Sequence, residues 1–123
     1  MVYIIENNGE TIMHMDMIVG LDKLSAKINA DYCKWMGNTD IDYDSAKESI
    51  RKFNSELQYT VGKKYIKFMS GTYCWGFVVL ENDKKFQRGD ILKPSTYKAP
   101  ARNFARGNIL NGDWSGVRWE GAS

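Results

Sequence analysis

The sequence has 123 residues, a net charge of +2, 43% hydrophobic and 26% charged residues, which is typical of one globular domain. No stretch reaches the ~18 apolar residues of a membrane-spanning helix, and the N-terminus lacks the basic start and apolar run of a signal peptide. These features argue against a membrane protein and predict a single cytoplasmic domain, residues 1–123, whose two cysteines, Cys33 and Cys74, are reduced.

The elements follow a simple order. Val2–Glu6 is rich in β-branched residues and predicts a first strand, followed by a turn at residues 7–9 and a short strand or lead-in over residues 10–15. From Asp16 the hydrophobic period changes to steps of three and four, which predicts a helix that Asp16 caps and Gly37 ends. Its apolar stripe is Leu21, Leu24, Ile28, Tyr32 and Trp35.

A second helix is predicted from the stripe Tyr43, Ala46, Ile50, Phe53 and Leu57, with a start at Asp42 or Ser45. Strands are then predicted at residues 64–69, 72–81, 91–92 and 114–119. Apolar residues on both faces of the 72–81 strand predict a central position, with Gly76 at a bulge or close backbone approach. The fold class is α+β: an antiparallel sheet of about four strands with two helices inserted after the first strand.

Charge is distributed unevenly along the chain. Residues 1–60 carry six basic and ten acidic side chains, whereas residues 61–123 carry eleven basic and five acidic ones. The basic excess includes residues 86–110, a segment with five basic residues, one acid, three aromatic rings and both prolines. This composition favours an anionic partner, and the rings favour one that contains a base.

A short helix is predicted between Pro100 and Gly107, because proline suits the first turn of a helix and glycine suits the position after its end. Arg102 and Arg106 would then lie one turn apart and clamp a phosphate. Asn103 and Asn108 would read a base or ribose. The candidate nucleotide-binding residues are Arg102, Asn103, Arg106, Lys98, Asn108, Phe104, Tyr97 and Phe86.

Plainer interpretations stay open for these residues. The two arginines could form a solvated helix face, and Phe104 could belong to the core. His14, the only histidine, is expected to have a structural role. Asp40, Asp42 and Asp44 fit helix capping better than a cation site, since the glycine and final glutamate of an EF-hand loop are missing. No catalytic motif is recognisable, so we expect a binding protein with no enzymatic activity, metal or cofactor.

One family resemblance rests on the run Phe86-x-x-Gly89-Asp90-Ile91-Leu92-Lys93 and on residues 98–108, KAPARNFARGN. These residues, together with the order of elements, resemble the first type of phage Thoeris anti-defence protein. That resemblance implies a phage-encoded sponge that acts in the cytoplasm of the infected bacterium. Such a sponge sequesters cyclic ADP-ribose-type signals (gcADPR-type), and for some members cyclic oligonucleotides, without degrading them.

The resemblance also implies a homo-oligomer, a dimer or a trimer of dimers, with pockets at subunit interfaces. Roles carry over only to Arg102, Asn103 and Arg106. Two alternatives follow from the residues alone: a single-stranded nucleic-acid-binding protein, or a protein inhibitor of a host factor that acts through its helical stripe and aromatic residues.

Overall fold

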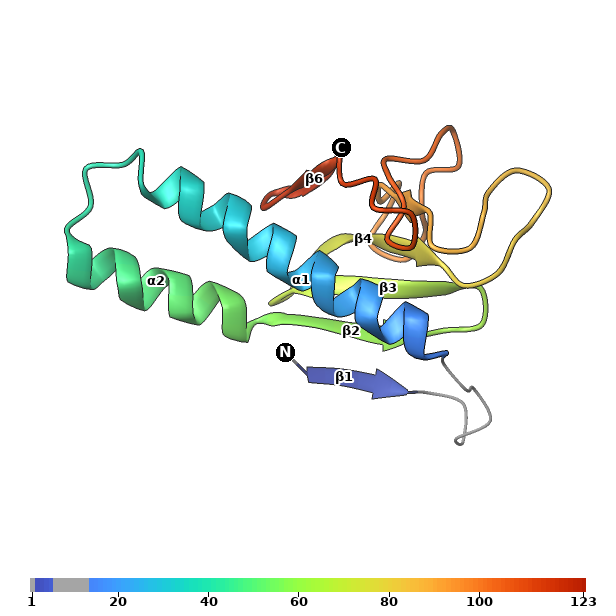
Figure 1. Cartoon of the computed structure of the whole chain (residues 1–123), viewed down its shortest axis with the longest axis horizontal. Helices are drawn as coiled ribbons and strands as arrows, with labels where there is room; N and C mark the ends of the chain where they lie inside the picture. Colours follow the sequence, from blue (N-terminus) through green and yellow to red (C-terminus); the bar gives the residue numbers. More distant parts are fainter. Residues whose placement is uncertain (1, 6–13) are drawn as a thin grey trace.

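The computed structural model describes the backbone of residues 2–5 and the whole of residues 14–123. Two helices, a mixed sheet and a small C-terminal ribbon make up this part of the chain (Figure 1). The elements are β1 (Val2–Ile5), α1 (Met15–Met36), α2 (Tyr43–Ser55), β2 (Leu57–Val61), β3 (Tyr65–Ser70), β4 (Tyr73–Val79), β5 (Ile91–Leu92), β6 (Val117–Arg118) and β7 (Gly121–Ala122). The turn predicted at 7–9 and residues 10–13 of the predicted second strand lie outside the described residues.

The main sheet has the strand order β1-β2-β3-β4-β5. Strands β2 to β5 pair antiparallel, and both helices lie in the chain between β1 and β2. The predicted α+β class is therefore confirmed. The structure adds that β1 pairs with β2 in parallel, with Val2 opposite Gln58, because the two helices form a crossover connection.

Strand β2 corrects the sequence analysis, which had continued the second helix to Leu57. Helix α2 ends at Ser55, and the following residues bury alternate side chains at Leu57, Tyr59 and Val61. Leu57 fits both periods, since it lies four residues after Phe53 and two before Tyr59. The strand period of two continues through Val61, and residues 57–61 pair with β3 along their whole length. The strand therefore forms here in place of a further helical turn.

Helix α1 covers one face of the sheet. Met17, Leu21, Leu24 and Ile28 are buried in the core that this helix shares with the strands. Asp16 does not cap the helix, because His14 occupies that position and its carbonyl accepts hydrogen bonds from the next turn. The helix ends at Gly37, as predicted.

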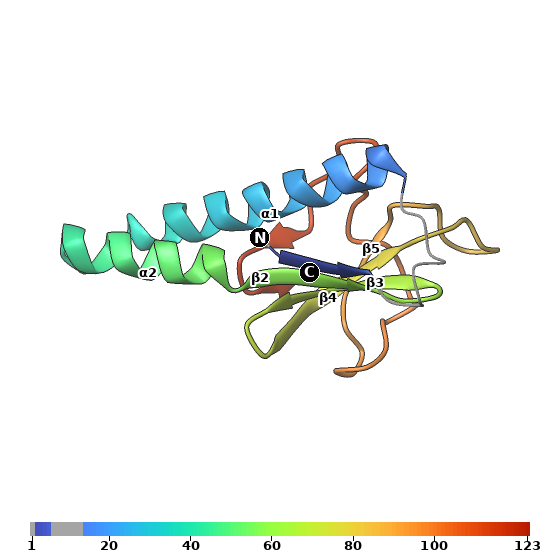
Figure 2. The ribbon, with the colours of Figure 1, turned by 90° about the horizontal axis from the view of Figure 1, so that it is seen from below.

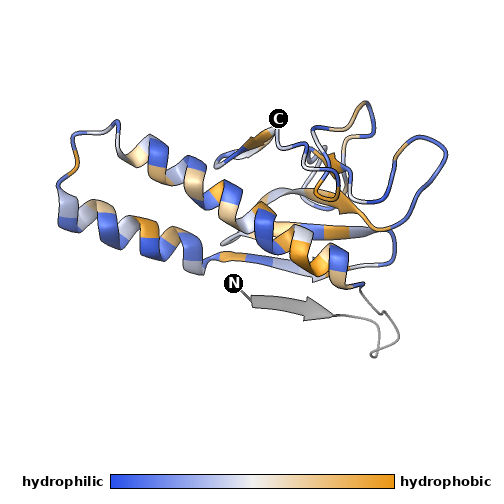
Figure 3. Cartoon of the chain, in the orientation of Figure 1, coloured by the Kyte–Doolittle hydropathy of each residue, from blue (hydrophilic) through white to orange (hydrophobic). Residues whose placement is uncertain are grey.

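Helix α2 has no buried residue and extends with the far half of α1 beyond the sheet (Figures 1 and 2). Its start at Asp42 is confirmed, since that carboxylate accepts hydrogen bonds from the Ser45 amide and hydroxyl, both at 2.9 Å. Figure 3 shows that hydrophilic and hydrophobic residues alternate along α2. Among the described residues, no helix is both long and apolar enough to cross a membrane.

Strand β4 is buried on both faces, as predicted. Trp75 and Val78 belong to the core beneath α1, whereas Cys74, Phe77 and Val79 belong to a second apolar cluster on the opposite face. Phe68 of β3 pairs with Gly76 of β4, and the next residue, Met69, pairs with Cys74. This β-bulge leaves Trp75 without a partner on β3. Beside it, a Cβ atom on Gly76 would lie 3.0 Å from the Leu92 carbonyl oxygen and 3.2 Å from the Ala122 Cβ. Both predictions for Gly76 are thus confirmed.

The C-terminal residues form a ribbon of two short strands where the sequence analysis predicted one strand at 114–119. Val117 pairs with Ala122, and both side chains enter the core beneath α1. The ribbon is attached to β4 by a 2.7 Å hydrogen bond from the Trp75 indole to the Arg118 carbonyl.

Candidate functional site

The segment 86–110 contains strand β5 and the loops on either side of it. Phe86, Leu92 and Ala105 pack on the face of the sheet opposite α1, whereas Ile91, Ile109 and Leu110 pack in the core that includes α1. Residues 100–107 are not helical, so the predicted short helix is wrong. The Arg106 amide donates instead to the Ile91 carbonyl at 2.7 Å, and the Ala101 amide donates to the Lys93 carbonyl at 2.7 Å. These long-range partners replace the bonds that a helix would make within itself.

Arg102 is held by its own chain. Its guanidinium donates to the Tyr65 hydroxyl and to the Asp83 carboxylate, the latter at 3.0 Å, and its Cζ lies 4.8 Å from the centre of the Phe86 ring. Backbone N–H groups of Phe86 and Lys85, together with Arg102, lower the pKa of Asp83 to about 2. Arg102 therefore ties the segment to β3 and to the preceding loop.

Arg106 belongs to a different group. Its Cζ lies 3.9 Å from the centre of the Phe104 ring, and its N–H groups donate to the Phe104 carbonyl and to the Asn103 side-chain oxygen, both at 3.2 Å. Phe104 is 58% exposed. Asn103, Phe104 and Arg106, called here the Arg106 cluster, thus bring three predicted residues together. The predicted clamp of two arginines is not formed.

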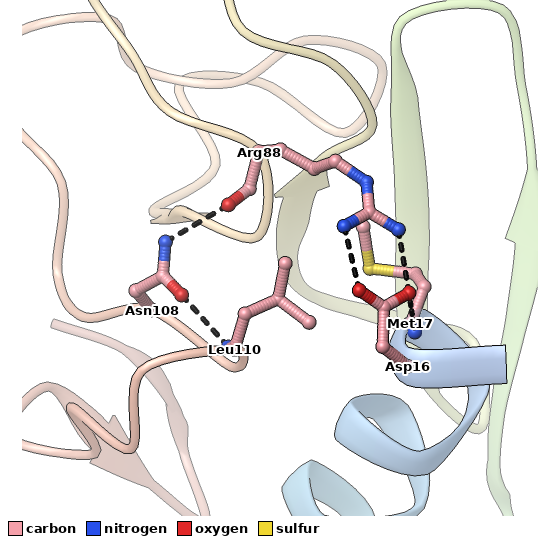
Figure 4. A network of polar contacts seen from close by, with 5 residues as sticks. All are labelled: Asp16, Met17, Arg88, Asn108 and Leu110. Atoms are coloured by element: carbon pink, nitrogen blue, oxygen red, sulfur yellow. Dashed lines mark hydrogen bonds and ion pairs between the residues drawn. The ribbon is translucent and has the colours of Figure 1, made fainter. Parts of the chain in front are cut away.

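Two other predicted residues are structural. Phe86 is 4% exposed and Asn108 is 5% exposed, so neither presents a free surface to a ligand. The Asn108 amide nitrogen donates to the Arg88 carbonyl at 3.0 Å (Figure 4). It also donates to the Asp90 carboxylate at 2.9 Å. Its oxygen accepts from the Leu110 and Asn111 amides, at 2.7 and 3.1 Å.

Arg88 continues this network to helix α1. Its guanidinium donates to both oxygens of Asp16, at 2.7 and 2.8 Å, which fixes the start of the helix to the segment (Figure 4). The hydrogen bond from Arg88 lowers the pKa of Asp16 to about 2.

A shallow pocket of about 300 Å³ lies between the loop that follows β5 and the β3–β4 turn. We call it the tyrosine–lysine pocket. Tyr97, a predicted residue, lies in its wall, and the Lys67 ammonium sits 3.4 Å from the centre of the Tyr97 ring. The lining residues are Thr72, Tyr73, Cys74, Lys93, Pro94, Tyr97, Gly121 and Ala122. Lys98 follows Tyr97 in the same loop and is exposed.

The charges at this pocket have one sign. Among the residues that the structure describes, its lining includes the Lys93 ammonium and no carboxylate. Neither Lys67 nor Lys93 forms an ion pair with a residue in the described part of the chain. Burial raises the pKa of the Cys74 thiol, which is therefore neutral at physiological pH and a poor nucleophile. Two exposed tyrosine rings beside unpaired ammonium groups favour a flat, anionic ligand.

Sequence reasoning missed Lys67 and Tyr73 as site residues. For Lys67 a signal was present, since the alternation of the 64–69 strand places it on one face with Tyr65 and Met69. Nothing in the sequence indicated that this face would meet the loop carrying Tyr97, because their contact spans 30 residues.

Comparisons with known proteins do not assign this site. No protein-family model matches the chain, and neither the curated proteins nor the solved structures give a significant match.

Proposed function

We propose that the protein binds and sequesters a small anionic nucleotide without degrading it. The ligand class that the family resemblance implies is a cyclic ADP-ribose-type signal, and the proposed setting is a phage-encoded sponge in an infected bacterial cell. The observation that carries the proposal is the tyrosine–lysine pocket, which Tyr73, Tyr97 and Lys93 line and in which no described lining residue is a carboxylate.

The Arg106 cluster supports the same ligand class. Its Phe104 ring is exposed with the Arg106 guanidinium over it, and Arg106 has no acidic partner among the residues that the structure describes. A phosphate of a bound ligand would supply the missing negative charge through charge-assisted hydrogen bonds. In the proposed oligomer, a second copy would bring such a surface to a shared pocket.

Calorimetric titration with a gcADPR-type cyclic nucleotide tests binding, and heat release of the ligand followed by mass spectrometry tests its fate. We expect saturable binding and recovery of the unaltered ligand. Failure to bind, or recovery of a hydrolysed product, would contradict the proposal.

Matched variants test the location. Lys93→Ala removes the charge from the tyrosine–lysine pocket, and we expect affinity to fall about tenfold, the loss of one charge-assisted contact. Lys27→Ala removes the same charge from an exposed position on α1, which covers the opposite face of the sheet, and should leave affinity unchanged. Equal effects of the two substitutions would show that binding follows net charge and not this pocket.

A further inference from the structure

A second pocket lies beside the first one and has a different chemistry. It measures about 410 Å³ and lies between the end of α2, the β3–β4 turn and the C-terminal ribbon. Its lining residues are Phe53, Ser70, Tyr73, Trp119 and Glu120. Three of the five are aromatic, and the only ionisable group besides the tyrosine hydroxyl is a carboxylate. We call it the aromatic pocket.

Two of its walls are fixed at nearly a right angle. The ring centres of Phe53 and Trp119 are 6.2 Å apart, with an angle of 82° between their planes. Tyr32 supports both from behind, stacked on Phe53 at 4.1 Å and edge-on to Trp119 at 5.2 Å. The Trp119 amide also donates to the Asp31 carboxylate at 2.8 Å, which holds the backbone of that wall.

The third ring is available to a ligand. Tyr73 is 57% exposed and lines both pockets. The pocket thus presents rings from three separate elements, α2, β4 and the C-terminal ribbon. Aromatic side chains gathered in this way can hold a cation, because ring faces carry a partial negative charge.

The charge of the aromatic pocket favours a cation. Glu120 makes no ion pair with any residue that the structure describes. The neighbouring Arg118 forms no ion pair with Glu120, and its guanidinium donates to the Ser115 and Val117 carbonyls at 3.2 and 2.9 Å. An unpaired carboxylate at the edge of a set of ring faces attracts a poorly hydrated positive charge.

We propose that the aromatic pocket binds an organic cation of the quaternary-ammonium type. The methylated ammonium group contacts the Phe53, Tyr73 and Trp119 rings, and Glu120 balances its charge. Inorganic cations do not satisfy this site, since they keep their hydration shell and gain little from ring faces. The site shares Tyr73 with the proposed nucleotide site, but the other lining residues and the sign of the charge differ between the two.

Choline and 3,3-dimethyl-1-butanol provide the test, because they share a shape and differ in charge. We expect choline to shift the indole N–H signal of Trp119 in a ¹⁵N correlation spectrum of the full chain. The signal is assigned with Trp119→Phe. The neutral alcohol should bind at least about fivefold more weakly, the difference expected of a cation–π contact.

Glu120→Gln should weaken choline binding about fivefold as well, whereas Glu81→Gln, an exposed carboxylate outside this pocket, should not change it. Both positions are exposed, so both variants should fold. Equal binding of choline and the alcohol, or no movement of the Trp119 signal with choline, would overturn the proposal. An equal effect of the two glutamate variants would also overturn it, because attraction would then be a property of the whole surface.

Discussion

The Asn108 side chain makes four hydrogen bonds where almost no water reaches it. It links the turn at residues 88–90 to the turn at residues 110–111, next to the backbone bridge between Asp90 and Asn108. The amide fits because it offers two donors and two acceptor positions in one plane. A residue that sequence reasoning assigned to ligand recognition thus serves the fold.

Asn108→Ala should lower the free energy of unfolding by about 2–3 kcal/mol, since it leaves several buried polar groups without partners. Asn103→Ala, an exposed position in the same segment, is the matched control and should change it by less than about 0.5 kcal/mol. Urea denaturation of the two variants measures both values. Similar losses would mean that the Asn108 network contributes little to stability.

Acid should weaken the ion pair between Asp16 of α1 and Arg88 of the segment 86–110. The pKa of Asp16 is about 2 in the folded protein against 3.8 ordinarily, so its contribution to stability is complete above pH 3.8 and is lost as pH falls toward 2. Urea midpoints measured across this range should fall less steeply for Asp16→Asn than for the unmodified protein. Asp22→Asn, an exposed helix position, should keep the original slope. If the urea midpoints of Asp16→Asn and of the unmodified protein fall equally steeply with pH, protonation of Asp16 is not the cause of the loss of stability.

Strand β4 depends on the absence of a side chain at Gly76. Added atoms would press on the Leu92 carbonyl of β5 and on Ala122 of the ribbon, so Gly76→Ala should cost about 1–3 kcal/mol of stability. Gly37→Ala is the control, because the nearest atoms to its Cβ would lie at 3.6 Å and its φ is −65°. We expect that change to be neutral or slightly stabilising. Thermal unfolding of the two variants and of the unmodified protein measures these effects. Equal melting temperatures for Gly76→Ala and the unmodified protein would show that β5 moves away without loss of stability.

The elements differ in how far sequence could predict them. Helix α1, strand β4 and the capping of α2 by Asp42 were predictable, because their residues interact mainly with near neighbours or show a clear period. The segment 100–107 was not, although Pro100 and Gly107 suit the ends of a helix. Its conformation depends on the Ile91 and Lys93 carbonyls, which no local pattern reveals. The role of Arg102 was missed for the same reason, since its partners Tyr65 and Asp83 lie far away in the sequence.

Over the whole molecule, the basic excess of the sequence lies in the segment 86–110 and not in the helices. Helices α1 and α2 together carry six basic and five acidic side chains, whereas this segment carries five basic side chains and one acidic one. An anionic ligand is therefore attracted more strongly to the segment 86–110 than to the helices.

The salt dependence of binding should show whether the ligand of this segment is a small nucleotide or a nucleic-acid strand. We expect affinity for a cyclic dinucleotide-sized anion to fall only a few-fold between low and physiological salt, because few charges are neutralised. A single-stranded oligonucleotide bound along this segment would lose about a hundredfold or more in affinity if it made six or more phosphate contacts. Fluorescence anisotropy at several salt concentrations distinguishes the two, and a steep loss would favour the nucleic-acid alternative.

The parallel pairing of β1 with β2 has a consequence for folding during synthesis on the ribosome. Val2 meets Gln58, so 56 residues must be added before the first strand has its neighbour. At a synthesis rate of about 5–20 residues per second, that interval is roughly 3–11 s. During this interval β1 has no partner strand, and its backbone hydrogen-bonding groups are exposed. Contact with a chaperone or with another nascent copy can then compete with correct folding.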